Sequence, residues 1–143
     1  MKKLLILCFV LLSSTAFANL DGQWSGWGEW TFQGSGAHCY TFLSFNETNS
    51  SLKRNESVFD CDYATLNILE ENWIKDGENL LIDGVVVGSV VGNNYKFFEN
   101  YSETVTIETL INVEGNHLDY KEIWKASGND LYVITGRLFR KQN

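Results

Sequence analysis

Residues 22–33 read Gly22-Gln23-Trp24-Ser25-Gly26-Trp27-Gly28-Glu29-Trp30-Thr31-Phe32-Gln33. Every even position is glycine or aromatic, and every odd position except Trp27 is polar. A period of two predicts a strand with one buried side and one wet side. Glycine inside a strand marks a sharp bend or the close approach of another backbone. A strand that bends while it buries tryptophan is typical of the wall of a small closed barrel.

The rest of the chain alternates β-branched and aromatic runs with short turn signals, and it contains no proline. The turn signals are Gly34-Ser35-Gly36, Asp76-Gly77, Asp83-Gly84, Gly92-Asn93-Asn94, Gly115-Asn116 and Ser127-Gly128-Asn129-Asp130. Asp83-Gly84 is the strongest two-residue hairpin signal among them. This pattern predicts an all-β fold, a single antiparallel up-and-down β-barrel of about eight strands, over residues 19–143.

Two segments leave alternatives open. Residues 46–57 are polar and long for a hairpin turn, so they form either a mobile loop or a pair of extended strand ends. In residues 65–74 the side chains of Leu66, Leu69 and Trp73 stand at helical spacing, so a short helix competes there with a strand.

The first eighteen residues have the organisation of a secretory signal peptide, with cleavage expected after Ala18. A basic start, Met1-Lys2-Lys3, precedes an apolar run over residues 4–12 and a small-residue site at 16–18. The apolar run is too short to span a bilayer, which needs roughly 20 residues. We therefore expect a periplasmic or secreted bacterial protein with no membrane insertion once the signal has been removed.

Cleavage would leave two cysteines, Cys39 and Cys61, because Cys8 departs with the signal peptide. In an oxidising compartment such an isolated pair predicts a disulfide. The loop that it closes is worth about 3 kcal/mol in the chain-entropy model. The spacing differs from that of redox and zinc motifs.

The mature chain is strongly acidic. Loss of two lysines with the signal peptide changes the formal charge from −7 to −9. This charge argues against nucleic acid and anionic membrane surfaces as partners; it either favours a basic protein partner or simply keeps the protein in solution.

The pair Gly22-x-Trp24 near the start of the mature chain resembles the opening of the lipocalins and their relatives, the calycins. The longer form Gly-x-Trp-x-Gly-x-Gly is similar to nitrobindin-type bacterial barrels. The resemblance implies that Trp24 closes the barrel floor and that an arginine of the last strand, Arg137 or Arg140, packs across it. Nitrobindins hold haem through a histidine near the C-terminus, and the last strand here has none, so no cofactor is expected.

Serine-nucleophile, phosphate-loop, dinucleotide and calcium motifs are absent from the sequence, and no enzymatic activity is predicted. On the penultimate strand Leu118, Tyr120, Glu122 and Trp124 share one face, which we expect to point inward. Glu122 would then be a buried charge, and Arg137 on the adjacent strand is the expected partner.

These observations predict an exported, non-enzymatic protein that binds a small, mostly apolar ligand inside the barrel, in space left by the inward glycines. The expected lining residues are Trp30, Phe32, Tyr120, Trp124 and, as a polar anchor, Arg137. The alternative is a module that binds a basic protein, because small acidic barrels with one disulfide resemble periplasmic lysozyme inhibitors.

Overall fold

The structure is a computed structural model and describes residues 19–32 and 34–142. The predicted signal peptide therefore lies outside the described residues. All eleven elements are strands. They are β1 (Gly22–Phe32), β2 (Ser35–Glu47), β3 (Ser51–Cys61), β4 (Ala64–Ile68), β5 (Glu71–Asp76), β6 (Asn79–Ile82), β7 (Val85–Val91), β8 (Asn94–Asn100), β9 (Val105–Glu114), β10 (His117–Ala126) and β11 (Asn129–Arg140).

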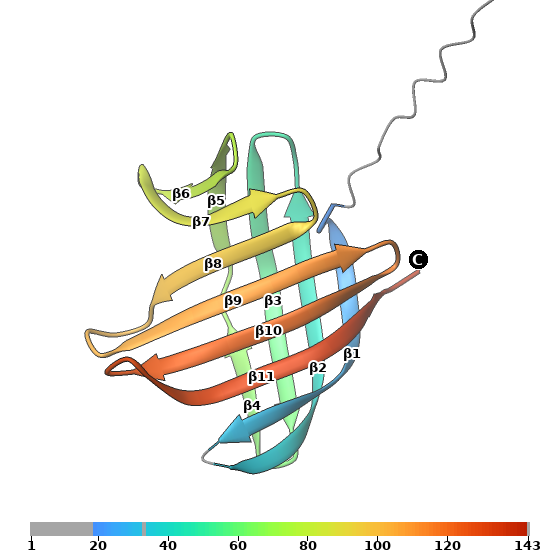
Figure 1. The fold of residues 1–143 in the computed structure, drawn as a ribbon. Coiled ribbons are helices and arrows are strands. Elements are labelled where there is room, and N and C mark those ends of the chain that lie inside the picture. The colour runs from blue at the N-terminus through green and yellow to red at the C-terminus, as the bar shows by residue number, and fades with distance from the viewer. Residues whose placement is uncertain (1–18, 33, 143) are drawn as a thin grey trace, which may run out of the picture.

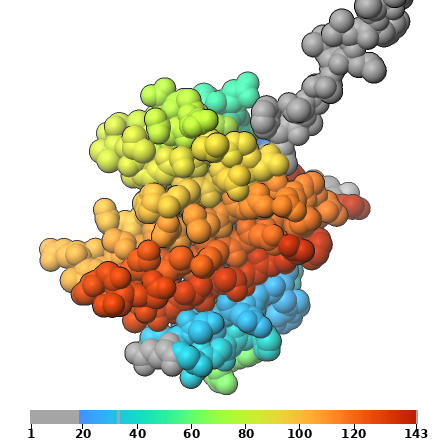
Figure 2. Space-filling model, viewed as in Figure 1, coloured from blue at the N-terminus to red at the C-terminus, as the bar shows by residue number. Residues whose placement is uncertain are grey.

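The strands form one antiparallel sheet that closes into a ring, as the alternation of the sequence predicts. Neighbours in the ring follow chain order except at β3, which pairs with β5, while β4 pairs with β3 alone; β1 closes the ring by pairing with β11. Figure 1 shows β8–β11 crossing steeply in front of β2, β3 and β4. In Figure 2 the side chains of β8–β11 cover the front of the molecule. Among the described residues no helix has the length and apolar character that crossing a bilayer requires.

The expected number of strands, about eight, is wrong, because the described part of the chain forms eleven. The excess arises in residues 64–82, where β4, β5 and β6 hold only 5, 6 and 4 residues. Strands this short give too few alternating positions to be read from sequence. Residues 65–74, for which helix and strand competed, lie in β4 and β5, with only Leu69 and Glu70 between the two strands.

Residues 46–57 form a pair of extended strand ends and not a loop. The turn between β2 and β3 is short, and the amide of Thr48 donates to the carbonyl oxygen of Ser51 at 2.8 Å. The Thr48 hydroxyl accepts from the amides of Ser50 and Ser51, at 3.2 and 3.0 Å. The Thr48 side chain thus provides hydrogen-bond partners for the backbone amides of the turn. The polar composition of this segment is therefore compatible with a tight hairpin.

A close-packed core fills the end of the barrel at which β1 begins, which we call the closed end. Trp24 and Trp73 are both fully buried there. They lie with Leu20, Leu43, Leu52, Leu80, Phe97, Val113, Leu118 and Leu138 in one cluster of buried side chains. The Trp73 and Phe97 ring centroids are 4.7 Å apart.

The inward glycines of β1 leave no space for a ligand, and the expectation that they do is wrong. A Cβ at Gly28 would overlap the carbonyl oxygen of Thr135 on β11, and one at Gly26 would overlap that of Arg137. The two strands therefore approach so closely that only hydrogen fits between them. The glycines produce the bend of the wall, and any binding space must lie elsewhere.

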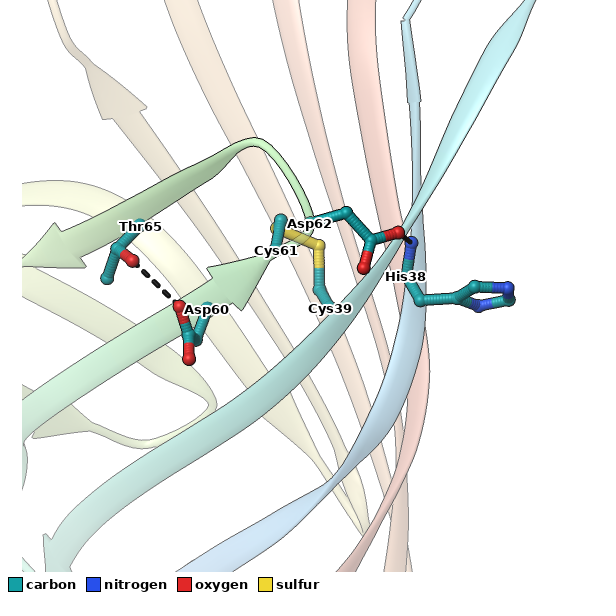
Figure 3. Close-up of a disulfide and its surroundings, with 6 residues drawn as sticks. All are labelled: His38, Cys39, Asp60, Cys61, Asp62 and Thr65. Carbon is teal, nitrogen blue, oxygen red and sulfur yellow. Dashed lines mark hydrogen bonds between the residues drawn. A yellow bond between two sulfur atoms is a disulfide. The ribbon is translucent and has the colours of Figure 1, made fainter.

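The predicted disulfide joins Cys39 of β2 to Cys61 of β3, which are directly opposite each other in the sheet. Figure 3 shows the disulfide and the side chains around it, where β2, β3 and the start of β4 meet. The Asp62 carboxylate accepts from the amide of His38 at 3.0 Å, and the Asp60 carboxylate accepts from the Thr65 hydroxyl at 2.8 Å. The bond thus fastens the β2–β3 pair next to the start of β4.

Candidate functional site: a cleft in the barrel wall

The ring of hydrogen bonds is interrupted on one side of the barrel. β4 and β5 pair with successive halves of β3, and β4 has no other neighbour among the described strands. Across from β4, residues 98–100 at the end of β8 pair with β9 but not with β7. The wall between β4 and this end of β8 therefore has no main-chain ladder.

A cleft of about 380 Å³ lies at this interruption. We call it the side cleft. Its lining residues are Arg54, Leu66, Asn67, Ile68, Leu69, Glu70, Glu71, Glu99, Tyr101, Ile107 and Trp124. They come from β3, β4, the β4–β5 junction, the end of β8, β9 and β10. Apolar and aromatic side chains thus share one concave surface with a few charged groups, which is the usual composition of a small-molecule site.

An ion pair bridges the wall where the ladder is missing. Arg54 projects inward from β3, is only 6% exposed, and meets Glu99 at the end of β8. Its Nη1 and Nη2 donate to the two Glu99 carboxylate oxygens at 2.8 and 3.3 Å. Its Nε donates to the carbonyl oxygen of Leu69 at 3.2 Å. A forked pair of this kind fixes the separation of the two edges.

Behind the cleft a buried carboxyl group is held by two neutral donors. Glu122 of β10 is 1% exposed. The Trp124 indole Nε1 donates to its Oε1 at 2.6 Å, and the Tyr120 hydroxyl donates to its Oε2. Burial raises the pKa of Glu122, although both hydrogen bonds act to lower it. The inward face predicted for β10 is therefore confirmed, since Leu118, Tyr120, Glu122 and Trp124 are all buried.

The predicted partner of Glu122 is wrong. Arg137 points to solvent, with 58% of its side chain exposed, and makes a forked pair with Asp119 at 2.7 and 2.9 Å. Arg137 and Asp119 are opposite each other on the outer face of β10 and β11. Side chains alternate along a strand, so Arg137 cannot share a face with Tyr120 or Glu122 and does not line the interior. The arginine inside the barrel is Arg54.

Aromatic side chains continue from the side cleft to the far end of β1. Ring centroids are 4.9 Å apart for Tyr101 and Trp124 and again for Trp124 and Tyr132. From Tyr132 the distances are 5.5 Å to Trp30 and 6.4 Å to Phe32. We call these five residues the aromatic row. Spacings in this range are typical of favourable ring contacts.

At the closed end, Arg140 and not Arg137 lies across Trp24. The guanidinium carbon is 4.2 Å from the ring centroid. Arg140 also donates to the carbonyl oxygens of Asn19, at 2.8 Å, and Asp21. Gly22 has φ +110°, and a Cβ there would be 3.2 Å from the Arg140 Nη1. Of the two last-strand arginines considered for this position, Arg140 is therefore the one that packs across Trp24.

Of the residues predicted to line a ligand site, only Trp124 lines the side cleft. Tyr120 lies behind the cleft, against Glu122 and with its ring 5.7 Å from that of Phe59. Trp30 is half-buried, Phe32 is 39% exposed, and both lie in the aromatic row away from the cleft. The sequence reasoning missed Arg54, Glu99 and Tyr101. A signal for Glu99 existed, since it continues the inward alternation of Tyr95 and Phe97.

A second hollow, of about 420 Å³, lies at the closed end around Glu47, Lys75 and Tyr95. These three side chains are already paired with one another. The Glu47 carboxylate accepts from the Lys75 Nζ at 2.7 Å, the Tyr95 hydroxyl at 2.8 Å and the Leu20 amide at 2.7 Å. This network seals the closed end and leaves the side cleft as the better candidate site.

Fold and site together define a closed antiparallel β-barrel with an apolar cleft in its wall. Comparison with known proteins adds no family to this description. No protein-family model matches the chain, and no curated protein matches it in sequence.

Proposed function

We propose that this is an exported, non-enzymatic binding protein that holds a small, mostly apolar ligand in the side cleft. The observation that supports this function is the cleft itself, about 380 Å³ of concave space lined by Leu66, Ile68, Ile107 and Trp124. Predominantly apolar walls with a few fixed polar groups are typical of ligand sites. The disulfide is compatible with the oxidising compartment to which the predicted signal peptide would lead.

The position of the cleft also suits reversible binding. A ligand would enter between β4 and the end of β8, where no main-chain hydrogen bonds have to break. The Arg54–Glu99 pair would keep the two edges at a fixed distance, so the site is formed before the ligand arrives.

The test is native mass spectrometry of protein purified from its producing cells without organic solvent. We expect a bound small molecule that solvent extraction removes. Ile68→Trp should fill the cleft and abolish the extra mass, whereas Ile74→Trp, at a 58% exposed position on β5, should retain it. Equal retention of the ligand by both variants would assign the ligand to another site, and the proposal would fail.

A second candidate function, binding of a basic protein, is favoured by an exposed aromatic pair on the outer wall. Trp27 is 67% exposed, and its ring lies edge-on to that of Tyr40 at 5.5 Å. Exposed tryptophan and tyrosine are over-represented at the energetic centres of protein interfaces. In a pull-down with basic hydrolases, Trp27→Ala should lose a captured partner, and high salt should weaken its capture. Phe98→Ala, at a 50% exposed position on β8, is the matched control.

A further inference from the structure

The side cleft has an excess of negative charge. Its lining contains one cationic side chain, Arg54, and three carboxylates, Glu70, Glu71 and Glu99. Arg54 is engaged by Glu99, and Glu70 pairs with Lys53 outside the lining at 2.9 Å. Among the described residues Glu71 has no ion-pair partner. An anionic ligand would therefore compete with Glu99 for Arg54 and meet the uncompensated carboxylate of Glu71.

The buried carboxyl group behind the cleft still has hydrogen-bonding capacity. Glu122 receives bonds from Tyr120 and Trp124 only, and a carboxylate offers about four acceptor positions. No cation of the described chain lies within ion-pair distance of it. A buried carboxylate with no cation beside it is costly, and a cation placed beside it recovers part of this cost.

A second unsatisfied group lies next to Glu122. Thr109 of β9 is directly opposite Glu122 in the β9–β10 ladder and is 4% exposed. Its hydroxyl has no hydrogen-bond partner within residues 19–32 and 34–142. Thr109 lies two residues from Ile107, so both side chains are on the inward face, and Ile107 lines the cleft. Buried polar groups in native proteins are normally paired, so an unpaired hydroxyl indicates a missing partner.

Aromatic rings stand between the mouth of the cleft and this polar spot. Tyr101 is 68% exposed, and Trp124 behind it is 7% exposed, with its N–H directed at Glu122. The faces of such rings attract cations because the ring quadrupole is negative there. The head group that suits all of these contacts carries a positive charge and hydrogen-bond donors. It can interact with the carboxylates, the ring faces and the Thr109 hydroxyl.

From these contacts we infer that the ligand is a protonated amine with an apolar body. Its ammonium group lies at the inner end of the side cleft, against the face of the Trp124 ring and directed toward the free acceptor positions of Glu122, and its apolar body lies against Leu66, Ile68 and Ile107. This inference rests on the proposed function and specifies the chemical class of the ligand.

Three probes with the same alkyl chain test it by calorimetric titration at neutral pH: decylamine, decanol and decanoate. Decylamine, which is protonated at that pH, should bind at least about tenfold more tightly than decanol, because a charge-assisted hydrogen bond is stronger than one from a neutral hydroxyl. Decanoate should bind most weakly. In Glu122→Gln the preference for decylamine over decanol should disappear, whereas in Glu78→Gln, at an exposed turn position, it should persist.

Tyr101→Leu keeps the inference testable if Glu122→Gln does not fold, because Tyr101 is exposed and its loss leaves the core intact. This variant should weaken decylamine binding about threefold, as one exposed cation–π contact predicts, and leave decanol binding nearly unchanged. Equal affinities for decylamine and decanol, or tightest binding of decanoate, would overturn the amine inference while the proposed function stands. No binding of any probe would overturn both.

Discussion

The guanidinium group of Arg140, near the C-terminus, lies across the indole ring of Trp24, near the start of the first strand, with the guanidinium carbon 4.2 Å from the ring centroid. The two residues are paired in the β1–β11 ladder that closes the ring. The same guanidinium group holds the carbonyl oxygens of Asn19 and Asp21, and the Trp24 Nε1 donates to that of Leu20 at 2.9 Å. The Arg140–Trp24 contact therefore holds β1 against β11, where the ring of strands closes, and also fixes residues 19–21 over the closed end of the barrel.

Arg140→Ala should lower the free energy of unfolding by about 2–3 kcal/mol, since it removes a cation–π contact and two charge-assisted hydrogen bonds. Arg137→Ala should change it little, because that side chain is paired only at the exposed surface. Urea denaturation of the two variants makes the comparison. Equal losses would mean that Arg140 does not hold the chain ends together.

Gly28→Ala should destabilise the barrel by about 1–3 kcal/mol, because the added methyl group overlaps the carbonyl oxygen of Thr135 and the strands must separate. Gly36→Ala is the matched control, since the nearest atom to a Cβ there, the Trp30 carbonyl oxygen, is 3.9 Å away. Thermal unfolding distinguishes them. A neutral effect at Gly28 would show that close approach does not produce the bend.

The sequence alone predicted the architecture well where one strand carries a strong alternation. In β1 the indole of Trp24 and the glycines at 26 and 28 indicated a bent, closed wall, and the Leu118-Tyr120-Glu122-Trp124 face of β10 was confirmed as buried. The Cys39–Cys61 bond was predictable because the third cysteine, Cys8, lies in the predicted signal peptide.

The candidate site could not be predicted in the same way, because it depends on a missing pairing. Nothing local shows that β4 ends at Ile68 and leaves its outer edge open. Arg54 and Glu99 are 45 residues apart and meet only across that opening. The choice between Arg137 and Arg54 as the interior cation likewise depends on the register of strands, which alternation along one strand does not fix.

Arg54→Leu should cost about 1.5–3 kcal/mol of stability, because the half-buried Glu99 would lose its charge-assisted hydrogen bonds. The double variant with Glu99→Leu should recover most of this loss. In the exposed pair Lys53–Glu70, removal of the lysine should cost less than about 1 kcal/mol. If the double variant is as unstable as Arg54→Leu alone, the two side chains do not act as a bridge across the wall.

The pH dependence of stability should report the burial of Glu122. Its folded-state pKa lies above the ordinary value of 4.5, so the folded protein binds the proton more tightly than the unfolded chain. The stability that this group contributes is therefore present at low pH and lost as the pH rises through the folded-state pKa. Relative to wild type, Glu122→Gln should become progressively more stable over that range.

Glu108 provides a control of opposite sign, because hydrogen bonds from Lys96 and Lys125 lower its pKa. Its contribution is present above 4.5 and lost as the pH falls, so Glu108→Gln should lose stability relative to wild type as the pH rises. Urea midpoints measured across the acidic range test both variants. Parallel curves for wild type and Glu122→Gln would contradict the burial of an ionisable Glu122.

The indole N–H resonances of the five tryptophans provide the most direct test of the side cleft as a ligand site. In a ¹⁵N-labelled sample titrated with decanol, the Trp124 resonance, assigned from Trp124→Phe, should shift most and in proportion to occupancy. Resonances of Trp24 and Trp73 in the core and of Trp27 on the outer wall should stay in place. A titration in which Trp27 shifts while Trp124 does not would place the ligand outside the barrel and contradict the proposed site.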